Sequence, residues 1–160
     1  MSKYLVNCFL LLLPVFLWNI AFMSRLPKGY TSNEIWDNVP TWLNMTENIL
    51  RAIVFLLPLL LIFSLQMKIQ KIGFGLYLVG LLIYFSSWLM QMISPNSNWS
   101  TSIIGFMAPA FTTVIWLIGI GIIGQQSFVN IPRISTIYVF LSIAFVMVHT
   151  YHSYLAYNQL

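Results

Sequence analysis

Five long apolar runs, joined mostly by short polar connections, dominate this chain of 160 residues. Hydrophobic residues make up 59% of the sequence and charged residues only 6%, which is far less charge than the surface of a water-soluble domain of this size needs. About 20 apolar residues suffice for a helix to cross a bilayer. The sequence therefore predicts an all-α integral membrane bundle, a single polytopic domain with five transmembrane helices over residues 4–23, 49–65, 72–92, 103–124 and 134–154.

Within these runs, polar and small residues recur at alternating steps of three and four, which places them on one face of an α-helix. The third run shows this stripe most clearly, with Gly73, Tyr77, Gly80, Tyr84, Ser87 and Gln91. The other stripes are Asn44, Glu47, Arg51, Val54 and Pro58; Ser102, Gly105, Pro109, Thr112, Trp116 and Gly119; Ser135, Tyr138, Ser142, Phe145, His149 and His152; and a weaker series, Asn7, Leu11, Pro14, Trp18, Ala21 and Arg25. In lipid, such faces turn toward other helices or a wet cavity, so tight packing and cavity lining are both open.

The distribution of basic residues favours an N-terminus in the cytoplasm and a C-terminus outside. In that orientation the cytoplasmic residues are Lys3, Lys68, Lys71 and Arg133, and the outer ones are Arg25, Lys28 and Arg51. The short multi-pass plan is typical of a bacterial inner-membrane protein. No basic cluster of the kind that binds nucleic acid is present in the sequence, so the lipid bilayer is the expected partner.

The first connection is the only long one, and it holds every acid of the chain: Glu34, Asp37 and Glu47. Residues 31–34 match a helix capping box, and apolar residues including Trp36 and Trp42 follow among polar ones. This pattern predicts a short interfacial helix in the first loop, interrupted at Pro40. Residues 44–47 would then cap the second span.

With this orientation, the heavier polar groups lie in the outer half of the bilayer and predict a polar vestibule open to the outside. Glu47 and Arg51 stand four residues apart in the order that favours a helical ion pair, and an inward-facing Arg51 would anchor an anion. The candidate ligand-binding residues are Arg51, Glu47, Tyr84, Ser87, Gln91, Trp99 and His149.

His149 and His152 lie three residues apart on one predicted helical face, so both imidazoles, with Glu47, are candidate metal ligands. No zinc-protease motif accompanies them, and no Asp or Glu lies inside a predicted span, which excludes intramembrane carboxylate catalysis. The sequence assigns no catalytic residue, and no cofactor is expected.

Three classes of function stay open. The first is a non-catalytic membrane protein that assembles with itself or with a partner complex. The second is a small binding or transport bundle that takes a lipid headgroup, an amphiphile or an anion into the vestibule. The third is a membrane enzyme with a metal site made by His and acidic residues. A non-catalytic role is favoured over the enzyme because neither the motifs nor the intramembrane carboxylates of known membrane catalysts are present.

Overall fold

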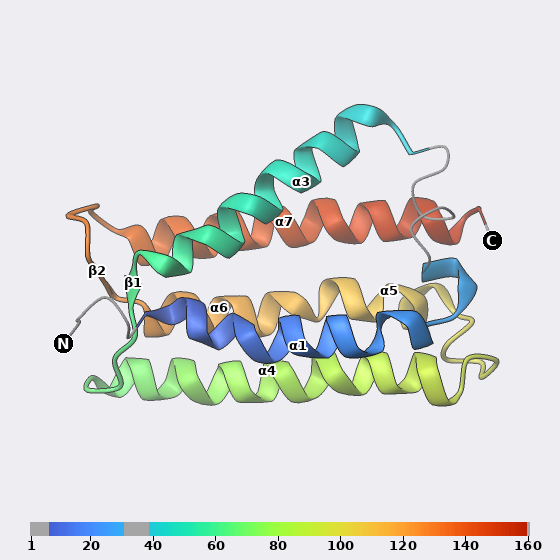
Figure 1. The fold of residues 1–160 in the computed structure, drawn as a ribbon, viewed down its shortest axis with the longest axis horizontal. Helices are drawn as coiled ribbons and strands as arrows, with labels where there is room; N and C mark the ends of the chain where they lie inside the picture. The colour runs from blue at the N-terminus through green and yellow to red at the C-terminus, as the bar shows by residue number, and fades with distance from the viewer. Residues whose placement is uncertain (1–6, 31–38, 160) are drawn as a thin grey trace.

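The computed structural model describes residues 7–30 and 39–159, and these form an all-α bundle of five helices, with the consecutive helices Ile103–Phe111 and Thr113–Ile123 counted as one, and a small two-stranded sheet at one end (Figure 1). Four helical segments of the described residues are long and apolar enough to cross a membrane: Cys8–Arg25, Lys68–Ile93, Ile103–Ile123 and Ile134–Tyr157. The multi-pass helical architecture expected from the apolar runs is therefore confirmed to the level of four candidate spans.

The first of these segments combines the 3₁₀ helix Cys8–Leu12, helix α1 (Leu13–Phe22) and the 3₁₀ helix Met23–Arg25. Helix α4 (Lys68–Ile93) and helix α7 (Ile134–Tyr157) are unbroken. Helices α5 (Ile103–Phe111) and α6 (Thr113–Ile123) follow one another through Thr112, shortly after Pro109, which cannot donate a backbone hydrogen bond. Helix α3 (Thr41–Leu56) packs against α7 and crosses it at an angle (Figure 1).

The second apolar run differs from the expected helix over 49–65. Helix α3 begins at Thr41, so residues 44–47 lie inside it rather than capping it, and it ends at Leu56. Pro58 then lies in the short 3₁₀ helix Leu57–Leu59, because its ring and missing N–H disfavour a continued α-helix. Of the predicted interfacial helix, residues 31–38 lie outside the described residues, and Trp42 belongs to α3.

The chain beyond this break forms strand β1 (Leu61–Ile62), which pairs antiparallel with strand β2 (Gln126–Ser127). Asn7 adds a further antiparallel bridge to Ile62. Three chain segments that are distant in sequence are thereby joined by backbone hydrogen bonds at one end of the bundle (Figure 1).

The predicted interior faces are confirmed in three of the four spans. In α4 all six residues from Gly73 to Gln91 of the stripe are buried, and the stripes of α5, α6 and α7 are buried or half-buried along their length. The series proposed for the first span is wrong, because Pro14, Ala21 and Arg25 are exposed. The buried face of that segment is instead apolar, with Cys8, Leu12 and Val15.

Helices α4 and α6 approach each other most closely, at glycines of both stripes. A Cβ atom on Gly80 would lie 2.5 Å from the backbone nitrogen of Trp116, and one on Gly119 would lie 2.7 Å from the backbone nitrogen of Tyr77. Only glycine allows this separation of the two backbones. The contact fixes Trp116 against α4, where its indole forms part of the site described next.

Candidate functional site

A cavity of about 370 Å³, here called the inner cavity, lies among α1, α3, α4, α5, α6 and α7. Its walls are mainly apolar and aromatic, with a few polar side chains, which is the usual composition of a small-molecule site. The lining residues are Val15, Phe16, Asn19, Met23, Leu26, Tyr30, Glu47, Arg51, Phe55, Tyr84, Trp88, Phe106, Pro109, Ala110, Thr113, Trp116, Phe145, His149, His152 and Ser153.

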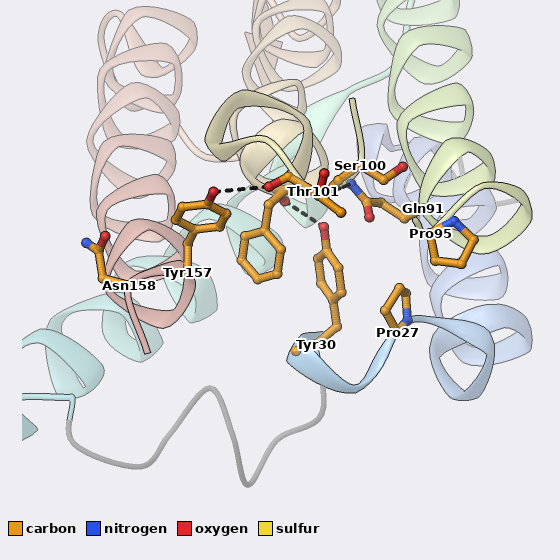
Figure 2. Close-up of a pocket in the computed structure, with 10 residues that line it drawn as sticks. Pro27, Tyr30, Gln91, Pro95, Ser100, Thr101, Tyr157 and Asn158 are labelled. Carbon is orange, nitrogen blue, oxygen red and sulfur yellow. Dashed lines mark hydrogen bonds between the residues drawn. The ribbon is translucent and has the colours of Figure 1, made fainter. Parts of the chain in front are cut away.

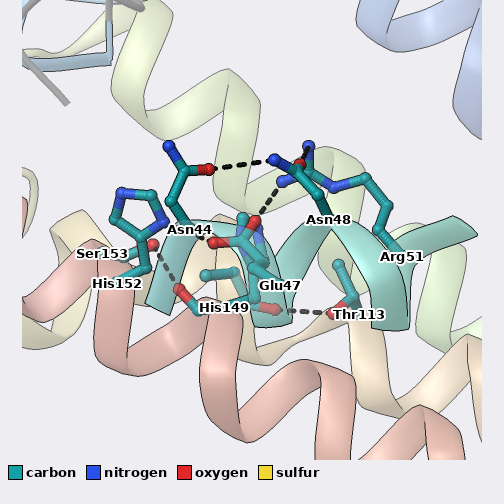
Figure 3. A network of polar contacts seen from close by, with 9 residues as sticks. Asn44, Glu47, Asn48, Arg51, Thr113, His149, His152 and Ser153 are labelled. Atoms are coloured by element: carbon teal, nitrogen blue, oxygen red, sulfur yellow. Dashed lines mark hydrogen bonds and ion pairs between the residues drawn. The ribbon is translucent and has the colours of Figure 1, made fainter. Parts of the chain in front are cut away.

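One wall of the inner cavity carries a network centred on Glu47 (Figure 3). The side chain of Glu47 is 1% exposed, and its Oε1 atom accepts a hydrogen bond from Nη2 of Arg51, one turn further along α3. His149 places its Nδ1 atom 3.0 Å from Oε1 of the same carboxylate. His152 contacts the other oxygen, Oε2, through its own Nδ1 atom. The Glu47–Arg51 ion pair predicted from the spacing is therefore confirmed.

The spacing of the two histidines explains how a single carboxylate reaches both. Residues three apart on α7 project from one face of the helix, and that face packs against α3. An ionised carboxylate only accepts hydrogen bonds, so each Nδ1 atom carries the proton in these contacts. In a neutral ring the Nε2 atom of His149 is then a hydrogen-bond acceptor, and this ring is also partly exposed.

A second polar pair on the wall joins α1 to α4. The Tyr84 hydroxyl donates to Oδ1 of Asn19 over 2.8 Å. The ring of Trp116 lies beside that of Tyr84, with centroids 6.3 Å apart; Trp116 is 1% exposed, and its indole N–H makes no hydrogen bond within the described residues. The inner cavity thus combines one charged cluster with several neutral polar groups in aromatic surroundings.

The structure brings four of the seven predicted ligand-binding residues to the inner cavity: Glu47, Arg51, Tyr84 and His149. The other three face elsewhere. Ser87 donates to the backbone oxygen of Tyr84 and lines an outer groove together with Trp99, which is 45% exposed. Gln91 is buried against α5 and the loop that precedes it.

The position of Gln91 has a clear structural reason. Pro109 has no N–H group, so the carbonyl of Gly105, four residues earlier, lacks its helical donor. The side-chain nitrogen of Gln91 donates to this carbonyl over 2.7 Å. Gln91 therefore supplies the hydrogen-bond donor that the proline lacks, and it does not face the inner cavity.

This role predicts that Gln91→Leu destabilises the protein by about 1–3 kcal/mol, because the Gly105 carbonyl is left buried without a donor. In a Pro109→Ala background the alanine N–H replaces the missing donor, so the same Gln91→Leu change should cost less than about 0.5 kcal/mol. Thermal unfolding of the four proteins in one detergent measures the coupling. Equal losses in both backgrounds would contradict the assignment.

A second cavity of about 480 Å³, the end pocket, lies between the C-terminal ends of α4 and α7 and the segment 27–30 (Figure 2). Tyr30 and Phe106 line both this pocket and the inner cavity. Their rings stack with centroids 4.6 Å apart, and the Tyr30 hydroxyl donates to the Phe106 carbonyl over 2.6 Å. Burial raises the pKa of Tyr30, which keeps the hydroxyl protonated as a donor.

The predicted metal ligands Glu47, His149 and His152 do meet, but as a hydrogen-bonded network. The two Nδ1 atoms contact different oxygens of the carboxylate, each within hydrogen-bonding distance. Across residues 7–30 and 39–159, no group of three His, Cys, Asp or Glu side chains is arranged to hold a metal ion.

Comparison with known proteins gives no assignment for this site. No protein-family model matches the chain, and no curated protein and no solved structure matches it either.

Proposed function

We propose that this chain is a multi-pass membrane protein whose inner cavity binds a small amphiphilic molecule. The observation that carries the proposal is the inner cavity itself, which combines aromatic walls with the Glu47 network on one side. Its volume of about 370 Å³ falls in the range of small-molecule sites. It corresponds to the liquid volume of roughly a dozen water molecules, which suits a compact amphiphile better than a whole phospholipid.

The polar and apolar parts of the walls suggest how such a molecule would lie. Phe16, Phe55 and Phe145 supply an apolar region, and the rings of Phe55 and Phe145 pack edge to face, with centroids 5.9 Å apart. Arg51 and His149 lie next to this region on the neighbouring turns of α3 and α7. An amphiphile with its apolar body among the phenylalanines would therefore place its polar end at the Glu47 network.

Filling the inner cavity should remove a bound molecule without removing the fold. Ala110 on α5 lines the inner cavity, whereas Ala108 on the same helix lines the outer groove. In native mass spectra of gently extracted protein, we expect the wild type and Ala108→Leu to carry one small molecule and Ala110→Leu to carry none. Equal occupancy of Ala110→Leu and the wild type would contradict binding in the inner cavity.

We further propose that the protein lies in a bacterial inner membrane with its N-terminus in the cytoplasm. The described chain begins and ends at opposite ends of the bundle, and Lys68 and Arg133 lie at the end with the sheet (Figure 1). This distribution of charge supports the cytoplasmic assignment of that end. The inner cavity would then lie in the outer half of the bilayer.

Cysteine labelling tests this orientation. In a Cys8→Ala background, Gln66→Cys and Asn98→Cys place single thiols at exposed positions near opposite ends of α4. A membrane-impermeant maleimide should label Asn98→Cys in intact cells and Gln66→Cys only after permeabilisation. Labelling of both in intact cells would contradict the topology, and the reverse pattern would invert it.

Assembly with itself or with a partner protein, which the sequence analysis predicts, stays a prediction. The exposed apolar side chains of the bundle, such as Leu82 and Phe140, would face lipid in a monomer equally well. Cross-linking in native membranes tests for assembly directly.

A further inference from the structure

We infer that the molecule held in the inner cavity has a polar end with hydrogen-bond acceptors and no donors, as in a carboxylate, an ester or a quinone carbonyl. The inference rests on the proposed function and adds the chemical class of the ligand. It follows from the polar groups of the walls, because those with unused hydrogen-bonding capacity are mainly donors.

Trp116 is the first of these groups. An indole N–H can only donate, and burial of a donor without an acceptor carries a free-energy cost. The side chain lines the inner cavity at 1% exposure, and its N–H has no acceptor among the described residues. The Nε1 atom is itself buried, so the ring must shift before a ligand can reach it; an acceptor on the ligand would then remove this cost, whereas a donor could not.

Asn19 adds two further donors from α1. Its Oδ1 atom accepts the hydroxyl proton of Tyr84, and this bond fixes the orientation of the amide. The amide N–H groups are used by no hydrogen bond recorded within the described residues. Asn19 lines the inner cavity, so its amide offers donors to a ligand.

Arg51 on α3 supplies a charged donor to the inner cavity. The guanidinium has five N–H groups, and its recorded bonds are those to Glu47 and Asn48. By contrast, the strong acceptor of the wall is already engaged, because Glu47 accepts from Arg51 and His149 at Oε1 and from His152 at Oε2. A ligand ammonium group would have to displace one of these partners.

Other acceptors also line the inner cavity and would favour a donor on the ligand. One is the Nε2 atom of His149 in the neutral ring, and because this ring is 32% exposed, it depends less on a ligand than a buried group does. The hydroxyl of Thr113 donates to the Ala110 carbonyl and the hydroxyl of Ser153 to the His149 carbonyl, which leaves their oxygen lone pairs available. A hydroxyl that already has one partner loses less without a second than a donor that has none. The balance of unused groups therefore favours an acceptor on the ligand.

Probes that share a ten-carbon chain and differ in the polar end test the inference. The full chain is placed in lipid nanodiscs, and quenching of tryptophan fluorescence by 10-bromodecanoate reports occupancy near Trp116 and Trp88. Saturable quenching, absent in Ala110→Leu, is expected on top of the linear quenching caused by partition into lipid. Decanoate, methyl decanoate and decylammonium are then compared as competitors.

We expect decanoate or methyl decanoate to displace the brominated probe at concentrations at least tenfold below that of decylammonium. The Arg51→Gln variant distinguishes a carboxylate ligand from a neutral carbonyl. If the ligand is a carboxylate, the variant should bind decanoate at least fivefold more weakly. If it is a neutral carbonyl, the affinities for decanoate and methyl decanoate should both stay unchanged. Trp116→Phe, which keeps the ring and removes the N–H, should reduce the thermal stabilisation by the better probe.

The outcomes separate the two proposals. Displacement by decylammonium at equal or lower concentration would overturn the acceptor inference and leave binding in the inner cavity intact. Quenching that never saturates in the wild type, together with native mass spectra that Ala110→Leu does not change, would overturn the proposed function itself.

Discussion

Replacing Gly80 with alanine is expected to destabilise the bundle by about 3 kcal/mol, the upper part of the range for overpacked cores. The new Cβ atom would lie 2.5 Å from the backbone nitrogen of Trp116 and 2.9 Å from its Cα atom. Neither atom can move by a change of rotamer, so α4 and α6 must separate. Thermal unfolding in one detergent should show a fall in melting temperature of about 6 °C or more.

Gly75 provides the matched control in the same helix. A Cβ atom there meets nothing within 4 Å, so Gly75→Ala adds only helix propensity and should change stability by between zero and about 1 kcal/mol in the favourable direction. Because Gly80 also sets the position of Trp116, Gly80→Ala should weaken probe binding as well. Similar melting temperatures for the two alanine variants would contradict the close approach of α4 and α6.

Replacing Glu47 with glutamine is expected to cost about 3–5 kcal/mol, the range found when one partner of a buried ionic group is removed. Glutamine keeps the shape but offers one acceptor and an NH₂ group, so one imidazole N–H or the guanidinium would face a donor. Helix α3 packs mainly on α7, and this network joins the two helices, so the docking of α3 should weaken first. Proteolysis within α3, compared with α4, measures that local loss.

Asn48→Ala is the control for this prediction. Asn48 is exposed, and its hydrogen bonds to Asn44 and Arg51 lie at the surface of the same helix. Its removal should change stability by less than about 0.5 kcal/mol. If Glu47→Gln were as mild as Asn48→Ala, the network would not be what holds α3 to α7.

The interior faces of α4, α5, α6 and α7 could be predicted from sequence because their buried positions carry polar or small residues among Leu and Ile. The first span could not, since its buried positions Cys8, Leu12 and Val15 are as apolar as its lipid-facing ones. Asn19 lies four residues after Val15 on the same helical face, and it lines the inner cavity. As a polar residue in an apolar run, it was the one available signal that this face points inward.

The site was predictable in part for a similar reason. Glu47 and Arg51 are one helical turn apart, and the two histidines share a face, so each pair follows from local spacing. Their meeting depends on how α3 packs against α7, which no local pattern encodes. Tyr30 and Phe106 escaped prediction because one lies in a connection and the other is an ordinary apolar residue of a span.

Pro58 shows how a single residue altered the second span. Hydropathy alone favours a helix to residue 65, because Leu and Ile continue beyond the proline. The chain instead turns at Leu57–Leu59 and enters β1, where Leu61 is buried and its backbone pairs with β2. A sequence pattern of apolar residues cannot separate these outcomes when the paired residues, Leu61 with Ser127 and Ile62 with Gln126, are 66 and 64 positions apart.

The sheet makes the two ends of the bundle mechanically unequal. At the end with β1 and β2, backbone hydrogen bonds tie the connections together, and separating them requires a strand to detach. At the opposite end, the Tyr30–Phe106 and Tyr157–Thr101 ties each depend on one phenol, which a rotamer change can release. Thermal motion should therefore hinge at the sheet and widen the bundle at the far end, which would give a molecule bound in the inner cavity a route in and out.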